Sequence, residues 1–84
     1  MTRETIIDAL INAAEEVLGL SPDDMRENTE LDLFENELID SIGCIALLTE
    51  VESIIGKSID VSQMVPNDFT SLSTMADAIE KITK

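Results

Sequence analysis

Residues 40–56 read DSIGCIALLTEVESIIG and predict a long, strongly apolar helix with a marked beginning and end. Asp40 is a residue type that caps helix N-termini, and Gly56 is the type that follows a helix C-terminus. We therefore expect a helix that begins at Asp40 or Ser41 and runs to Ile55. Its aliphatic residues fall on more than one side, so we predict that it is the central helix of the fold. Gly43 would leave a smooth surface near its start, which suits close approach by a partner.

Two further amphipathic stripes flank this segment. The first helix should begin after the capping residue Thr2 and end at Gly19, and the last should begin after Ser71. Their apolar residues recur at spacings of three and four. These residues are Ile6, Ile7, Leu10, Ile11, Ala14, Val17 and Leu18 in the first stripe, and Leu72, Met75, Ala76, Ile79 and Ile82 in the last.

The segments between the stripes read mainly as loops. Residues 21–24 have turn chemistry, and residues 25–39 read as a long loop. Apolar anchors should pin that loop to the core: Met25, Leu31, Leu33, Phe34, Leu38 and Ile39. Residues 58–64 have no second strand to pair with, so we expect a loop there too. Residues 66–68 can open a short helical turn. The sequence thus predicts one all-α domain over residues 1–84, a small bundle of three main helices and one short helix.

Composition excludes several classes of function. The chain has 84 residues, with 18 acidic and 5 basic side chains, no histidine and a net charge of −13. Nucleic acid and anionic membrane surfaces are poor partners for such a chain. Histidine catalysis and histidine-ligated metals are impossible. Cys44 is the single cysteine and has no internal partner. With no visible signal peptide and no run long enough to span a bilayer, we expect a cytoplasmic protein and no membrane insertion.

No catalytic constellation or metal site emerges from the sequence. There is neither a Gly-rich phosphate loop nor a calcium-binding loop, because Glu37 stands where a loop starting at Asp32 would need glycine. The acids are instead concentrated: residues 27–56 hold eight of them and no base. That segment is either a solubilising face or a docking face for basic partners. An acidic helical interaction module without a covalent cofactor is accordingly one functional hypothesis.

Ser41 lies at the middle of this acidic segment, where the N–H groups of a helix start would stabilise a phosphate on its hydroxyl. The surrounding residues 32–43, DLFENELIDSIG, resemble the attachment site of acyl carrier proteins, whose signature is Asp-Ser-Leu or Asp-Ser-Ile at a helix start. Chain length, the acidic loop, the absence of Trp and Tyr, and the Ser71-Leu72 helix start agree with the resemblance, which covers essentially the whole chain.

The resemblance implies a non-catalytic carrier whose Ser41 bears 4′-phosphopantetheine, donated from coenzyme A by a phosphopantetheinyl transferase. The prosthetic thiol would hold an acyl or aminoacyl group as a thioester. Asp40 would cap the helix and help the transferase to recognise the site. A monomer is expected, served by a loading ligase and a downstream transferase or synthase with basic docking surfaces. The residues expected to contact these partners or flank the arm are Glu37, Ile42, Ile45, Glu50 and Glu52.

The residues next to Asp40 and Ser41 also indicate which carrier proteins this chain resembles most. Carriers of housekeeping fatty-acid synthesis usually have an acid directly after Asp-Ser-Leu, whereas Gly43 stands here. Peptidyl carriers usually show Gly-Gly before Asp-Ser, whereas Leu38 and Ile39 precede Asp40. The pattern is closer to D-alanyl carrier proteins and specialised stand-alone carriers. The cargo stays open among the chemistries of fatty acid or polyketide biosynthesis, peptide synthesis and D-alanylation.

Overall fold

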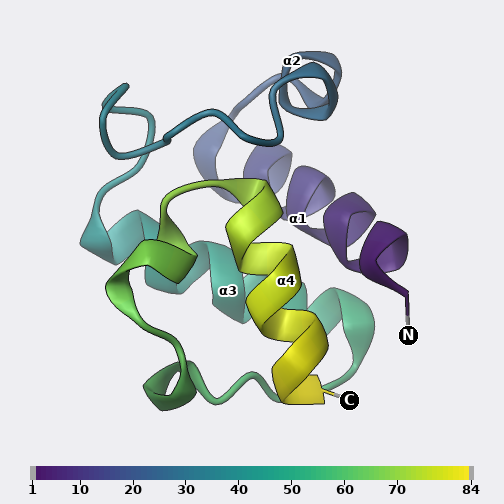
Figure 1. The fold of residues 1–84 in the computed structure, drawn as a ribbon. Helices are drawn as coiled ribbons and strands as arrows, with labels where there is room; N and C mark the ends of the chain where they lie inside the picture. Colours follow the sequence, from purple (N-terminus) through teal and green to yellow (C-terminus); the bar gives the residue numbers. More distant parts are fainter. Residues whose placement is uncertain (1, 84) are drawn as a thin grey trace.

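The structure, a computed structural model, describes residues 2–83 as an all-α fold (Figure 1). Within these residues the helices follow one another as α1 (Arg3–Leu18), α2 (Pro22–Glu27), α3 (Ser41–Ile55), the 3-10 helices η1 (Val61–Gln63) and η2 (Pro66–Phe69), and α4 (Leu72–Thr83). The predicted all-α bundle is confirmed. None of these helices is long and apolar enough to cross a membrane.

Helix α1 begins and ends where its sequence predicts. The Thr2 hydroxyl accepts a hydrogen bond from the Thr5 N–H at 3.2 Å, which satisfies one of the free donors of the first turn. At the other end Gly19 adopts a left-handed conformation with φ 69°, and its N–H donates to the Glu15 carbonyl at 3.1 Å. A side chain is unfavourable at such a φ, so glycine suits this position.

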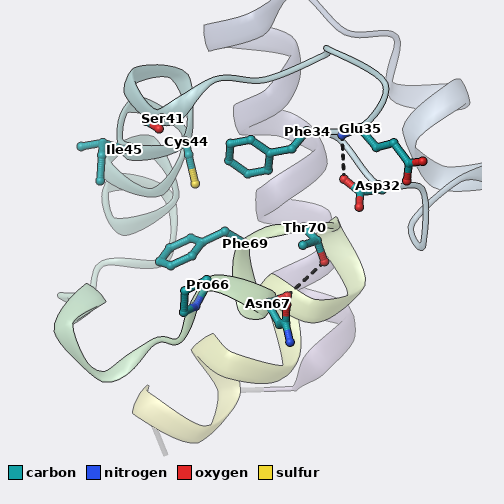
Figure 2. A pocket seen from close by; sticks show the side chains of 10 residues that line it. All are labelled: Asp32, Phe34, Glu35, Ser41, Cys44, Ile45, Pro66, Asn67, Phe69 and Thr70. Atoms are coloured by element: carbon teal, nitrogen blue, oxygen red, sulfur yellow. Dashed lines mark hydrogen bonds between the residues drawn. The ribbon is translucent and has the colours of Figure 1, made fainter.

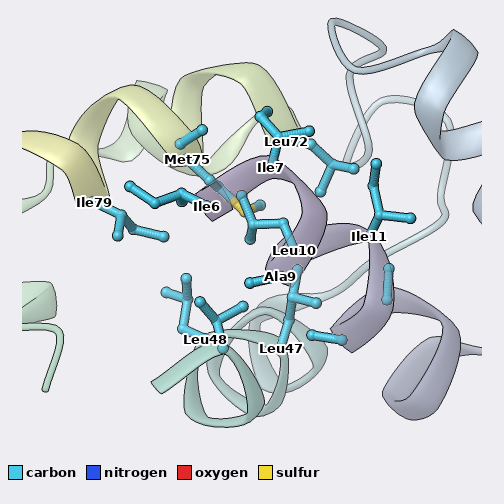
Figure 3. Packing of buried hydrophobic residues seen from close by; sticks show 14 of the residues in the cluster. Ile6, Ile7, Ala9, Leu10, Ile11, Leu47, Leu48, Leu72, Met75 and Ile79 are labelled. Carbon is cyan, nitrogen blue, oxygen red and sulfur yellow. The ribbon is translucent and has the colours of Figure 1, made fainter. Parts of the chain in front are cut away.

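Helix α1, rather than α3, is the centre of the fold. It packs against α3, α4 and α2, and seven of its residues are buried, compared with four in α3. Figure 3 shows Ile6 and Leu10 of α1 between Leu47 and Leu48 of α3 and the α4 side chains. The prediction of a central α3 is therefore wrong. Its extra apolar residues do not face a second neighbour but solvent: Ile42, Ile45 and Ile54 are 82%, 54% and 44% exposed.

The predicted loop of residues 25–39 begins later than expected. Residues 22–27 form α2, in which the Ser21 hydroxyl accepts from the Asp24 N–H at 3.4 Å and Met25 is buried. The loop that follows is attached to the segment before α4, because the Leu33 N–H donates to the Thr70 carbonyl at 2.7 Å. Leu33 and Ile39 are buried anchors, as predicted. Phe34 is not a core anchor, because 38% of it is exposed.

Gly43 is closely surrounded by other residues of the chain. A Cβ there would lie 3.1 Å from Asp40 Oδ1 and 3.3 Å from Leu18 Cδ2. The end of α1 and the helix cap account for a glycine at this position, and the close approach of a partner stays a prediction. The small residue lets α3 begin close against α1.

The segment between α3 and α4 contains no strand among the described residues, as predicted. Glu52 in α3 fixes the beginning of this segment, because Glu52 Oε2 accepts a hydrogen bond from the Ile59 N–H at 2.6 Å. The predicted short turn at residues 66–68 is the 3-10 helix η2. The predicted cap of the last helix is also present, since the Ser71 hydroxyl accepts from the Thr74 N–H at 3.1 Å.

Candidate functional site

Ser41 is the first residue of α3 and is exposed to solvent. The preceding Asp40 is the N-cap: its Oδ1 accepts the Gly43 N–H at 2.6 Å and holds the first turn in place. Within residues 2–83 the Ser41 hydroxyl makes no side-chain hydrogen bond of its own, so it is available for modification. The helix start adds a positive dipole end, which favours a negatively charged group on this hydroxyl.

A groove of about 560 Å³ opens beside Ser41. Its walls come from the loop before α3, from α3 itself and from the η2 region (Figure 2). Most of the lining is apolar and consists of Phe34, Cys44, Ile45, Pro66 and Phe69. This volume lies within the range of sites that hold small organic groups, about 300–1,000 Å³.

Asp32 and Thr70 make local hydrogen bonds at the end of the groove away from α3, where the side chains of Glu35 and Asn67 also belong to the lining. Asp32 Oδ1 accepts the Glu35 N–H at 2.9 Å, and the Thr70 hydroxyl donates to the Asn67 carbonyl at 3.0 Å (Figure 2). These local hydrogen bonds shape the two loops. Beside α3 the lining is apolar apart from Ser41.

Cys44 belongs to the apolar wall rather than to a reactive centre. It lies one helical turn after Ser41, is only 4% exposed, and is a free thiol. Burial raises the pKa of the Cys44 thiol above its ordinary value of 9.0. The protonated thiol therefore persists at neutral pH, where it behaves as a small apolar side chain.

The residues predicted to meet partners are not all in one environment. Ile42 and Ile45 are exposed close to Ser41, and Ile45 also lines the groove. Glu37 is exposed in the loop before α3 and has a positive φ of 58°, a conformation that disfavours most side chains. Glu50 is half-buried on α3. Glu52 is half-buried and engaged with the Ile59 N–H.

Two groove residues, Phe34 and Phe69, escaped prediction as site residues. The sequence predicts Phe34 as a core anchor and gives Phe69 no role, and no local pattern links two residues that 34 intervening positions separate. The signal that could have identified them is their rarity, since they are the only aromatic residues in the chain.

These features fit a phosphopantetheine group. An exposed hydroxyl at a helix start can take a phosphodiester, and the adjacent groove offers apolar surface to what the group carries. The N-terminal end of a helix favours a phosphate through its dipole, without a basic side chain. Ser41 and Asp40 would hold the attachment end.

Comparisons with known proteins agree. The family model described as "Phosphopantetheine attachment site" matches residues 8–79. The D-alanyl carrier protein of Streptococcus equi subsp. zooepidemicus (strain MGCS10565) is 27% identical over 81 residues, which cover 96% of this chain and 94% of that protein. The D-alanyl carrier protein of Lacticaseibacillus rhamnosus is 28% identical over 81 residues, which cover 96% of this chain and 98% of that protein. That of Lacticaseibacillus casei (strain BL23) is 35% identical over 63 residues, covering 75% of each chain.

The matched region includes all of α2, α3 and the groove beside Ser41, and most of α1 and α4. The chain therefore belongs to the phosphopantetheine-attachment family of carrier proteins, with 4′-phosphopantetheine as its covalent cofactor.

Proposed function

We propose that this protein carries an acyl or aminoacyl group as a thioester on 4′-phosphopantetheine attached to Ser41, and passes it between partner enzymes in the cytoplasm. The observation that supports this most is the exposed Ser41 hydroxyl at the start of α3, beside an apolar groove. The group supplies a terminal thiol that forms the thioester.

The residues of the chain present the cargo rather than transform it. Asp40 fixes the first turn of α3 and so the position of the Ser41 hydroxyl. Within residues 2–83 no cluster of three or more Cys, Asp or Glu side chains can hold a metal ion. The phosphopantetheinyl transferase, a loading ligase and a downstream transferase or synthase would supply the chemistry.

The partners would dock on the acidic side of the chain around Ser41. Glu37, Glu50 and Glu52 would meet basic residues, and Ile42 and Ile45 would add apolar contacts. The exposure of Ile42, at 82%, supports such a contact, because a largely solvated Ile contributes little to the core. Relatives named as D-alanyl carriers make D-alanine one candidate cargo.

Incubation with coenzyme A and a promiscuous phosphopantetheinyl transferase tests the attachment. The wild type should gain the mass of one phosphopantetheine group. Ser41→Ala should gain nothing, whereas the matched control Ser53→Ala, an exposed serine on the same helix, should be modified like the wild type. An unmodified wild type, or equal modification of Ser41→Ala, would overturn the proposal and favour an acidic interaction module without a covalent cofactor.

A further inference from the structure

Gly43 stands in the first turn of α3 although its backbone does not call for glycine. Unlike Gly19 and Gly56, which end helices with positive φ, Gly43 has no positive φ. In a helix, alanine raises the folding equilibrium constant by about fivefold over glycine. The chain forgoes that gain close to Ser41, so the reason for the glycine lies in the space around it.

Three side chains surround the position that a Cβ of residue 43 would occupy. Asp40 Oδ1 would lie 3.1 Å from that Cβ, Leu18 Cδ2 3.3 Å and Ile39 Cγ1 3.4 Å. Non-bonded carbon atoms are best separated by about 3.5–4.0 Å. A methyl group at this position would therefore require Asp40 or Leu18 to move by a few tenths of an ångström.

The backbone of Leu18 is fixed. Leu18 is the last residue of α1, and two backbone hydrogen bonds close the turn that follows it. The Gly19 N–H donates to the Glu15 carbonyl at 3.1 Å, and the Leu20 N–H donates to the Ala14 carbonyl at 3.3 Å. Because α1 is also the central helix, its end gives the first turn of α3 a rigid neighbour.

The Asp40 carboxylate is the group that a Cβ would disturb most directly. Its Oδ1 accepts the Gly43 N–H at 2.6 Å, and the Asp40 carbonyl accepts the Cys44 N–H at 2.8 Å. Ser41 lies between the two ends of these hydrogen bonds. A shift of the Asp40 carboxylate would therefore change the turn that carries the Ser41 hydroxyl.

The attachment reaction is sensitive to such a shift. Ser41 Oγ forms a bond to the coenzyme A phosphorus that bears the pantetheine arm. The bond from this phosphorus to the oxygen of adenosine 3′,5′-bisphosphate breaks, and the hydroxyl proton passes to a base of the transferase. Misplacement of a reacting group by about 1 Å can slow a reaction by about a hundredfold.

We propose that Leu18 and Gly43 are positioning residues for the attachment: together they hold the Asp40 cap, and through it the Ser41 hydroxyl, in the geometry that the transferase requires. This inference rests on the proposed attachment to Ser41. Leu18 and Gly43 act through Asp40 and not on the reacting atoms themselves. The contact between Leu18 and Gly43 thus connects the end of α1 to the modification site.

Single-turnover modification of the full chain, with coenzyme A and transferase in excess, separates docking from positioning. Gly43→Ala should lower the rate at saturating transferase by about fivefold to tenfold, and should change the half-saturating transferase concentration by less than about twofold. In Leu18→Ala, the same Gly43→Ala change should lower the saturated rate by less than about twofold. The shortened side chain leaves room for the new Cβ, so Asp40 can keep its place.

Two controls distinguish positioning from a general loss of stability. Leu20→Ala truncates another half-buried leucine just after α1, away from the Cβ position of residue 43, and should keep the wild-type saturated rate. Hydrogen exchange of the residue 43 amide reports the cap directly. Exchange should be severalfold faster in Gly43→Ala and return towards the wild-type rate when Leu18→Ala is added, whereas overall destabilisation would not be reversed by a second truncation.

The outcomes separate this inference from the proposed function. If the wild type is not modified, the attachment to Ser41 itself fails. If the wild type and Gly43→Ala are modified at the same saturated rate, or if Gly43→Ala costs the same factor with and without Leu18→Ala, the inference is overturned and the carrier function stands. If the double variant is too unstable to purify, the saturated rate and the residue 43 amide of Gly43→Ala still decide the outcome.

Discussion

Glu52 connects α3 to the segment that follows it, and removal of its carboxylate should lower stability. Glu52 Oε2 accepts a hydrogen bond from the Ile59 N–H at 2.6 Å, and Ile59 itself is buried. A hydrogen bond to a charged group contributes about 1.5–3 kcal/mol, and loss of the acceptor leaves the N–H unpaired. Because the bond is only partly buried, we expect Glu52→Ala to lower the free energy of unfolding by about 1.5 kcal/mol. In a domain of this size that is a fall in Tm of roughly 6–12 °C.

Glu50→Ala is the matched control for this prediction. It lies on the same helix, is also half-buried, and makes no side-chain hydrogen bond within residues 2–83. Each variant removes one negative charge from a chain of net charge −13, so relief of repulsion is similar in both and cancels in the comparison. Glu52→Gln should fall between the two, since its amide oxygen remains an acceptor without the charge.

Urea unfolding of the three variants measures the difference. The expected order of stability is Glu50→Ala, then Glu52→Gln, then Glu52→Ala. If the free energies of unfolding of Glu50→Ala and Glu52→Ala agree within about 0.5 kcal/mol, the hydrogen bond from the Ile59 N–H to Glu52 does not contribute as argued.

Three further predictions concern the start of α3 and its surface. Asp40→Ala should cost about 1 kcal/mol of stability in thermal unfolding, and Asp40→Asn much less; slower modification of Asp40→Asn would then isolate recognition of the charge by the transferase. The raised pKa of buried Cys44 means that the unfolded state releases this proton first, so stability should fall above about pH 9. Cys44→Ala should flatten that fall in urea midpoints measured between about pH 8 and 10. Glu50→Lys should slow loading severalfold at low salt and much less above about 0.15 M, where screening removes steering by basic partners.

Local signals in the sequence predicted the long helices well. Thr2 and Gly19 cap α1, and Asp40 and Gly56 cap α3, because these residues act on backbone groups within one turn of themselves. Helix α2 was missed for a local reason too. Ser-Pro-Asp-Asp begins a turn and a short helix with the same chemistry, and six residues give too little periodicity to tell them apart.

The groove could not be predicted in the same way. It exists because the Leu33 N–H pairs with the Thr70 carbonyl, which brings the loop before α3 against the segment before α4. That contact joins residues 37 positions apart, and no local pattern encodes it. The resemblance of residues 32–43 to carrier proteins predicted Ser41 and Asp40 as site residues. Phe34 could not be predicted in this way, because it lines the groove only as a result of the contact between Leu33 and Thr70.

Helix α3 contains more aliphatic residues than the core uses, which is why it was wrongly predicted to be central. A helix rich in aliphatic residues was expected to be surrounded, yet α3 buries four residues and exposes three isoleucines. The core is complete without them, because α1 lies between α3 and α4 and supplies seven buried residues. Exposed isoleucines weaken solubility and gain nothing in the isolated domain. Two of them, Ile42 and Ile45, lie within one turn of Ser41, so the apolar excess of α3 is concentrated where a transferase or a cargo would meet it. We therefore expect the partners of the carrier to contact this surplus of apolar residues.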